Sequence, residues 1–212
     1  IRAAVGHVVA ARGSVSHAVW FATEKPEFIR KYINKVAMTQ KFAIYIHTPF
    51  CHHRCAYCDF TTYAGKEDAI PTFVDALCRE INLVASSTAY KMTAGSIYFG
   101  GGTPSLLPSS QIERILHALH DNFLLADPEI SLEANPGTVS PELLRDLRVL
   151  GINRLSLGVQ SFQINELLFL ERIHNPDDVF HAVEWSRHAG LENLNFDLIY
   201  GLPSQTISSW NA

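Results

Sequence analysis

Three closely spaced cysteines are the residues of this chain with the clearest potential for chemistry. Cys51, Cys55 and Cys58 lie within eight residues, on a polar segment that follows the apolar run 43–50. Thiolates on one short loop can converge on a metal centre. Three of them leave one position of a [4Fe–4S] cluster without a cysteine ligand. An iron with such an open position can bind a substrate or a cofactor, so the spacing favours an iron–sulfur cluster.

A structural zinc ion is the main alternative for these cysteines, with His47, His52 or His53 as its fourth ligand. Zinc sites usually present a second Cys or His pair further along the chain. The only other cysteine, Cys78, lies in an amphipathic segment, where packing is its expected role. A disulfide framework is not expected, because four cysteines in 212 residues are few and the chain carries no secretory signature.

The composition suits one compact domain, or most of one. Of the 212 residues, 47% are hydrophobic and 18% are charged. No apolar run approaches the roughly 18 residues that span a bilayer. The net charge is −4 without a basic stripe, which argues against a nucleic-acid partner. Exposed thiolates suit a reducing compartment, so we expect the cytoplasm.

Charge divides the chain near Met38. Residues 1–37 carry six basic and two acidic residues, a net charge of +4, which leaves 11 basic and 19 acidic residues, a net charge of −8, for residues 38–212. We predict an amino-terminal extension at 1–37, either not native or a presequence, which would place the protein in the mitochondrion. Residues 38–212 would form the core domain. Residues 201–210 look like a loop entering a helix, so we expect this domain to be incomplete at its carboxyl end.

Two periodicities alternate along the core domain. Short apolar runs predict strands at 43–47, 96–99, 129–134, 154–159 and 194–200. Helical spacing of apolar residues predicts helices at 70–84 and 112–119, after Ser140-Pro141 as far as Gly151, and from Asn175-Pro176 to Gly190.

A capping box of Ser110 and Glu113 is expected to start the second of these helices. Repeated βα units predict a parallel sheet. Polar and glycine-rich motifs follow each predicted strand. The carboxyl ends of parallel barrel strands form one face, so we expect these motifs to meet there in one site.

Six ordered motifs resemble the radical S-adenosylmethionine (SAM) family, whose cluster motif is CxxxCxxC. They are YIHTPFC at 45–51, GGGTP at 100–104, LEANPG at 132–137, GVQSF at 158–162, RIH at 172–174 and DLIYGLP at 197–203. The resemblance covers residues 44–210 and is closest to the branch of HemN, the oxygen-independent coproporphyrinogen III oxidase, and HemW. It implies an α/β fold, a partial (β/α)6 TIM-like barrel, truncated here after about five βα units.

The resemblance also implies two cofactors. Cys51, Cys55 and Cys58 would hold a [4Fe–4S] cluster, and its fourth iron would bind SAM, which is cleaved reductively to methionine and a 5′-deoxyadenosyl radical that abstracts hydrogen. The glycine run would meet the amino group of SAM, Arg172 its carboxylate and Asp197 its ribose. The implied SAM-binding residues are Tyr45, Tyr57, Gly101, Gly102, Thr103, Glu133, Gln160, Arg172 and Asp197.

Taken without the resemblance, several of these residues have structural alternatives. The glycine run could be a tight turn. Glu133 could form a structural salt bridge, for example with Arg154, because a buried carboxylate needs a partner. Arg172 and His174 could be solvated residues at a helix end. Tyr45 could belong to the core.

The residue two positions after the third cysteine distinguishes the two members of the branch. Phe60 stands where HemN-type oxidases have a fourth cysteine. This difference favours a HemW-like haem chaperone, which would bind haem and deliver it to client haem proteins. The His-Asn-x-x-Tyr-Trp motif associated with haem is absent from these residues. An oxygen-independent coproporphyrinogen III oxidase, decarboxylating a porphyrinogen, is the first alternative, and a zinc-binding structural module is the second.

Overall fold

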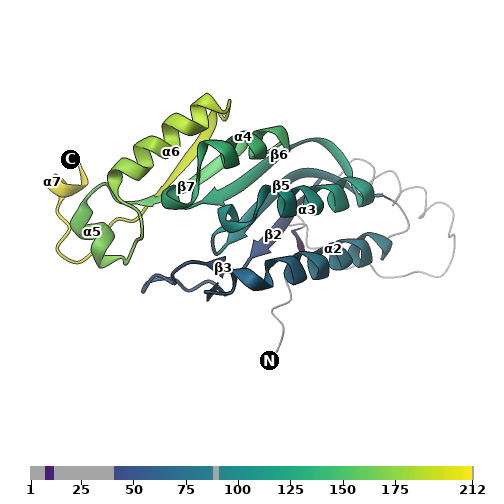
Figure 1. Ribbon diagram of the computed structural model, residues 1–212, viewed down its shortest axis with the longest axis horizontal. Helices are drawn as coiled ribbons and strands as arrows, with labels where there is room; N and C mark the ends of the chain where they lie inside the picture. The colour runs from purple at the N-terminus through teal and green to yellow at the C-terminus, as the bar shows by residue number, and fades with distance from the viewer. Residues whose placement is uncertain (1–7, 12–40, 88–90, 212) are drawn as a thin grey trace, which may run out of the picture.

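The structure, a computed structural model, describes residues 8–11, 41–87 and 91–211 (Figure 1). The predicted boundary of the amino-terminal extension lies outside the described residues, so it stays a prediction. Within the described residues, no helix combines the length and the apolar character that a bilayer-spanning segment requires.

A six-stranded sheet forms the centre of the fold, in the order β1-β2-β5-β6-β7-β8. Its strands are β1 Val8–Ala11, β2 Phe42–Thr48, β5 Thr93–Gly101, β6 Leu124–Ala134, β7 Arg154–Gln160 and β8 Asn193–Leu198. All neighbouring pairs from β2 to β8 are parallel, as the βα alternation predicts. Strand β1 pairs antiparallel with β2 and had no counterpart in the prediction from sequence.

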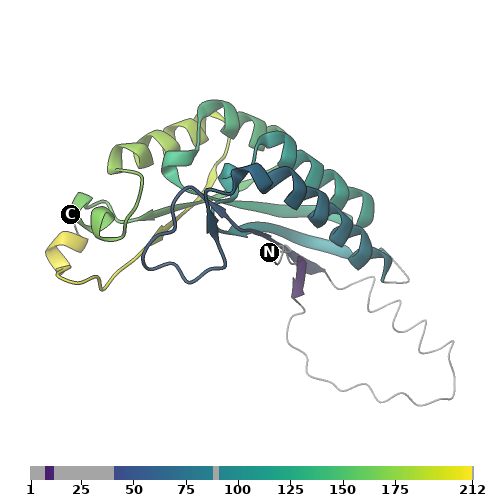
Figure 2. The same cartoon turned by 60° about the horizontal axis from the view of Figure 1, so that its bottom comes forward.

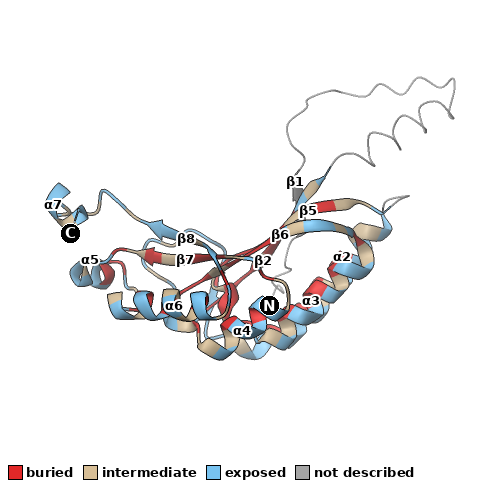
Figure 3. Cartoon of the chain, turned by 90° about the horizontal axis from the view of Figure 1, so that it is seen from above, coloured by how far each residue is buried: buried red, intermediate tan, exposed pale blue. Residues whose placement is uncertain are grey.

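Helices cover one face of this sheet, as Figures 2 and 3 show. The four helices of this layer are α2 Ile70–Ser86, α3 Ser109–Asn122, α4 Pro141–Val149 and α6 Pro176–His188. The shorter helices α5 Ile164–Phe169 and α7 Ile207–Trp210 lie near the carboxyl ends of β7 and β8. An open parallel sheet with one helical layer is the partial-barrel architecture that the sequence predicted.

Two of the predicted helix starts are confirmed. The Ser140 hydroxyl accepts a hydrogen bond from the Leu143 amide at the start of α4. Asn175 and Asp178 form a capping box at the start of α6. The predicted Ser110–Glu113 capping box is wrong. Helix α3 begins two residues earlier, at Ser109, after the extended Pro108 and with no side-chain cap, so Ser110 already lies within the first turn.

The core lies between the sheet and the helices. Ile97, Leu132 and Leu155 on three neighbouring strands are each 0% exposed, and they belong to one cluster with buried leucines of the helices, such as Leu77 and Leu144. Burial of this apolar surface drives the helices onto the sheet. The opposite face carries polar side chains and, in the part of the chain that the structure describes, no helical layer, so it is available to the site.

Candidate cluster- and cofactor-binding site

A cavity of about 520 Å³ lies at the carboxyl ends of the parallel strands. Its size is in the range of cofactor sites, roughly 300–1,000 Å³. Of the twelve residues predicted for the site, eleven line it: Cys51, Cys55, Tyr57, Cys58, Gly101, Gly102, Thr103, Glu133, Gln160, Arg172 and Asp197. The expectation that strand-end motifs meet in one place is therefore met by the fold, although their roles remain to be tested.

The cysteine loop is held at its base by a small second sheet. Strand β3, Phe50–Cys51, pairs with β4, Tyr63–Ala64, so the ends of the loop lie side by side. All three cysteines are free thiols. Cys51 is buried and burial raises the pKa of its thiol. Cys55 and Cys58 are half-buried and joined by a turn in which the Cys58 amide donates to the Cys55 carbonyl, at 3.0 Å.

The glycine run lies directly against this loop. The Gly102 amide donates to the Thr48 carbonyl at 2.7 Å, and the Thr103 amide donates to the Phe50 carbonyl at 2.8 Å. A Cβ atom on Gly102 would lie 2.6 Å from the Phe50 carbonyl oxygen and 3.0 Å from the Cys51 sulfur. Such an approach requires glycine. The glycine run is thus more than a tight turn, because its backbone packs closely against Cys51 and the residues before it.

The geometry of the loop bears on which metal centre it can hold. Among the described residues, no group of three His, Cys, Asp or Glu side chains has its ligand atoms placed for one metal ion. A zinc ion needs all its thiolates about 2.3 Å from a single point. In a [4Fe–4S] cluster each thiolate binds its own iron atom, so the sulfurs stand further apart. A cluster therefore requires three thiols at one cavity but not their convergence on a single point, and Cys51, Cys55 and Cys58 all line the cavity.

The histidines considered as a fourth zinc ligand are engaged elsewhere. His52 and His53 are exposed, and each lies 3.0 Å from a glutamate, Glu67 and Glu171 respectively. His47 contacts the Tyr45 hydroxyl at 3.1 Å and the carbonyl of Thr61 at 2.9 Å. These contacts hold the cysteine loop against β2, the turn before α2 and the segment after α5.

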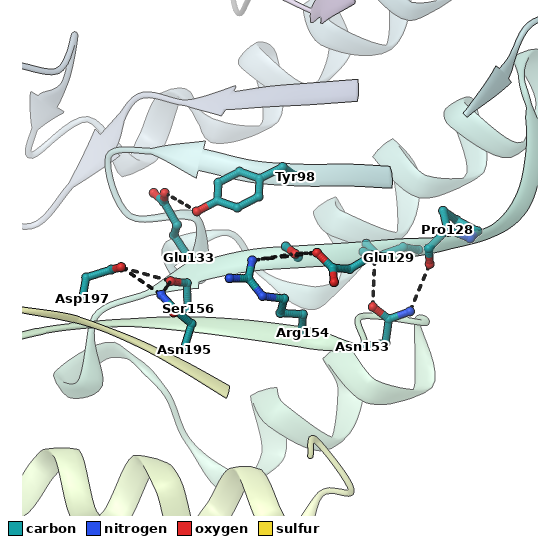
Figure 4. A network of polar contacts seen from close by, with 11 residues as sticks. Tyr98, Pro128, Glu129, Glu133, Asn153, Arg154, Ser156, Asn195 and Asp197 are labelled. Carbon is teal, nitrogen blue, oxygen red and sulfur yellow. Dashed lines mark hydrogen bonds and ion pairs between the residues drawn. The ribbon is translucent and has the colours of Figure 1, made fainter. Parts of the chain in front are cut away.

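Glu133 closes β6 at the inner wall of the cavity (Figure 4). The Tyr98 hydroxyl donates to Oε1 at 2.7 Å, and the Gly101 amide donates to Oε2 at 3.1 Å. Burial raises the pKa of Glu133, and these two hydrogen bonds offset part of the rise. The salt bridge with Arg154 that the sequence left open is absent, because Arg154 pairs with Glu129 at 3.9 Å and donates to the hydroxyl of Ser131.

Asp197 faces the cavity from β8 and is held by two neighbours (Figure 4). The Ser156 hydroxyl donates to its Oδ2 at 3.0 Å, and the Asn195 amide donates to its Oδ1 at 2.9 Å. The same amide nitrogen lies 2.9 Å from the Ser156 hydroxyl oxygen. The sequence reasoning missed Ser156 and Asn195. Alternation of polar and apolar residues along β7 and β8 was the signal that could have placed them beside Asp197.

Arg172 reaches the cavity from the segment after α5. Its Nη2 donates to the Gly158 carbonyl at 2.8 Å, while Nη1 lies 3.4 Å from the Tyr57 hydroxyl and 3.6 Å from the Cys55 sulfur. Its Nε atom is buried and has no hydrogen-bond partner among the described residues. A solvated helix-end position is therefore ruled out for Arg172. The guanidinium group belongs to a residue that lines the cavity, where a carboxylate is its matching partner.

Gln160 and Tyr45 occupy different surroundings. Gln160 lines the cavity in the left-handed region, at φ 67°, a conformation that non-glycine residues rarely adopt outside functional sites. Tyr45 lies outside the cavity lining. Its ring stacks on that of Tyr98, with centroids 6.2 Å apart. Tyr45 therefore supports Tyr98 and, through its hydroxyl, His47.

Residues 45–212 match the family model described as the radical SAM superfamily. The chain belongs to the radical SAM superfamily. It is 42% identical over 177 residues, 80% of the chain, to the "Heme chaperone HemW" of Synechocystis. It is 34% identical over 181 residues, 84% of the chain, to the oxygen-independent coproporphyrinogen III oxidase of Bradyrhizobium diazoefficiens. Family membership implies a [4Fe–4S] cluster and SAM as cofactors.

A solved radical SAM structure shares the fold. Coproporphyrinogen III oxidase (HemN) from Escherichia coli superposes with a TM-score of 0.73 at 34% identity, covering 79% of this chain and 39% of that one. The two sequence relatives are covered to 42% and 40% of their lengths. The chain therefore spans about two-fifths of the radical SAM proteins that it matches.

Proposed function

We propose that this protein is a HemW-like radical SAM protein that binds haem and delivers it to client haem proteins in the cytoplasm. The observation that carries the proposal is the convergence of three free cysteines, an unpartnered arginine donor and two fixed carboxylates on one cavity. The 42% identity to a HemW over most of the chain supports the choice within the superfamily. Haem and the client proteins are carried over from that relative.

In this proposal Cys51, Cys55 and Cys58 hold the cluster. When bound, a reduced cluster and SAM together supply radical chemistry. The thiol of Cys51 is the most buried, and the glycine run keeps its surroundings free of side chains, which helps to exclude water. Gly101 and Gly102 line the wall, and their carbonyl oxygens would accept hydrogen bonds from the amino group of SAM.

The remaining cavity residues bind and orient SAM. Arg172 would pair with its carboxylate through its guanidinium group. Asp197, with each oxygen already fixed by a neutral donor, would accept hydrogen bonds from the ribose hydroxyls. Glu133, whose pKa is raised by burial, would accept a hydrogen bond from a cationic group of the ligand. Tyr57 and Gln160 complete the wall, and Tyr45 supports it from behind.

An oxygen-independent coproporphyrinogen III oxidase is the second candidate. It is favoured by the 34% identity to such an enzyme and by the match to HemN. Phe60 argues against it. This residue is 61% exposed and lines the cavity where the oxidase branch carries a further cysteine. The loop therefore presents an aromatic ring in place of a thiol.

The decisive experiment is anaerobic iron–sulfide reconstitution of the full-length protein, followed by electron paramagnetic resonance with and without SAM. A reduced-cluster signal that changes when SAM is added is the expected result. A colourless protein with stoichiometric zinc would overturn the proposal. Haem binding without decarboxylation of coproporphyrinogen would favour the chaperone, whereas decarboxylation would establish the oxidase.

A further inference from the structure

His174 is a buried titratable residue to which none of the roles above applies. It is 3% exposed and follows Arg172 by two residues. Its Nδ1 lies 3.0 Å from Oδ1 of Asn135, after β6, and its Nε2 lies 3.0 Å from the Val159 carbonyl oxygen on β7. One imidazole ring therefore joins the segment that carries Arg172 to the ends of two neighbouring strands.

The ring is neutral near pH 7. Burial, and then the charge of Arg172, lower the pKa of His174 to about 4. A neutral imidazole donates through one nitrogen and accepts at the other. The Val159 carbonyl can only accept, so Nε2 carries the hydrogen. Nδ1 faces Oδ1 of Asn135, which also accepts a hydrogen bond from the Gly137 amide at 3.2 Å.

The segment after α5 makes two hydrogen bonds to the end of β7. His174 binds the Val159 carbonyl, and Arg172 Nη2 binds the adjacent Gly158 carbonyl at 2.8 Å. On the amino-terminal side, the Arg172 amide donates to the Leu167 carbonyl at 2.9 Å, at the end of α5. The backbone of Arg172 is thus fixed on both sides, which leaves its guanidinium beside Cys55 and Tyr57.

We infer that His174 is a positioning residue, which holds Arg172 in place for the carboxylate of the ligand in the cavity. The ligand's identity as SAM rests on the proposed function, whereas the clamp itself rests on these hydrogen bonds. An arginine side chain has many rotamers, and ordering it costs conformational entropy when it binds. The backbone of Arg172 is fixed and its Nη2 is already hydrogen-bonded, so less conformational entropy is lost when the side chain binds the ligand. His174 acts through Arg172 and touches no reacting atom.

The test uses the full-length protein, reconstituted with its cluster. His174→Leu keeps the volume but removes both hydrogen bonds, and His174→Gln can still donate to Val159. Val179→Ala, in the buried face of α6, is a matched control that removes packing without touching Arg172. We expect SAM binding about tenfold weaker in His174→Leu at unchanged iron content, as for other residues that orient a ligand-binding side chain. The effect should be smaller in His174→Gln and absent in Val179→Ala.

A double-mutant cycle separates positioning from general stability. In an Arg172→Ala background, His174→Leu should not weaken SAM binding further, because its effect passes through Arg172. A full additional loss in that background would overturn the inference. So would wild-type affinity in His174→Leu, or an equal loss in Val179→Ala.

Hydrogen exchange keeps the inference testable without either cofactor. In the protein before reconstitution, the amides of residues 170–175 should exchange faster in His174→Leu than in Val179→Ala. Equal exchange in the two variants would overturn the clamp. If the wild-type protein binds a cluster but no SAM, the proposed function fails, whereas the exchange result still decides on the clamp.

Discussion

The two faces of the parallel sheet differ along every central strand. Leu132 faces the helices and is 0% exposed, whereas its neighbour Glu133 faces the cavity and takes hydrogen bonds from Tyr98 and Gly101. Strands covered by helices on both faces read as nearly continuous apolar runs. Here polar and apolar residues alternate. The helix-covered face stabilises the fold and the open face lines the cavity. Substitutions on the first face should therefore lower the free energy of unfolding, and substitutions on the second should weaken ligand binding.

The largest effect is expected at the cysteine loop. Cys55→Ala should abolish both the cluster and SAM cleavage, because a three-thiolate site has no spare ligand. Iron content and the paramagnetic signal of the reduced protein measure this. Cys78→Ala is the control. Cys78 lies on α2, where its thiol contacts the Arg114 carbonyl, so its removal should leave the cluster intact. A cluster that survives in Cys55→Ala would make the ligand assignment wrong.

Leu132 and Glu133 provide a direct comparison of the two faces. Leu132→Ala should destabilise the fold by about 2–5 kcal/mol in urea denaturation, since it leaves a cavity in the core. Glu133→Gln should lower the free energy of unfolding by about 1–2 kcal/mol, because its one amide oxygen can accept from the Tyr98 hydroxyl but leaves the Gly101 amide without an acceptor. It should nevertheless weaken SAM binding. The comparison breaks down if Glu133→Gln destabilises the protein as much as Leu132→Ala does.

Local sequence signals predicted the helix-covered face well. The strand and helix order came from two periodicities, and the residues that stabilise the core, such as Ile97 and Leu155, stand at the expected spacings. Ser140 and Asn175 were recognised as helix starts because a capping residue acts within its own turn. The start of α3 was misjudged because Pro108 begins that helix through its backbone, without a side-chain cap.

Motifs and topology predicted which residues meet at the cavity face of the sheet. They did not predict the hydrogen bonds and ion pairs among those residues. Parallel strand ends must meet, so the convergence of Cys51, Glu133 and Asp197 could be inferred. The partners of those residues depend on register and rotamer. Asn195 bonds Asp197 across a strand pleat, and Arg154 chooses Glu129 over Glu133. Alternation along β8 could place Asn195 on the same face as Asp197, but the rotamers that join the two side chains and the pairing of Arg154 with Glu129 are not contained in the spacing of residues.

Buried His174 makes the stability of the fold depend on pH. Its folded pKa, about 4, lies below the unfolded value near 6.5. Its neutral form therefore favours the fold fully above pH 6.5. As the pH falls from 6.5 towards 4, the unfolded chain takes up a proton that the folded chain does not, and stability is lost. The loss is roughly 3 kcal/mol at most, from 1.36 kcal/mol per pKa unit.

Urea denaturation of wild type and His174→Gln at pH 7.5 and 5 isolates this contribution. Other groups titrate in both proteins, so only the difference between the two pH profiles is attributed to His174. We expect the profile of the variant to be flatter in this window. Parallel profiles would mean that folding does not shift the pKa of His174, whereas a ring protonated in the fold, with both nitrogens donating to Asn135 and Val159, would make the wild type lose stability as the pH rises.

The smallest effect tests how firmly the open face holds its own side chains. Asn195→Ala removes the donor to Oδ1 of Asp197 and leaves the one from Ser156 to Oδ2. Asp197 is exposed, so water replaces part of the lost contact, and SAM binding should weaken only about threefold. Asn193→Ala, on the same strand but at its opposite end, is the matched control and should leave binding unchanged. If both variants bind SAM like the wild type, Asp197 is placed by the strand alone, and the polar network of the open face contributes no orientation to the ligand.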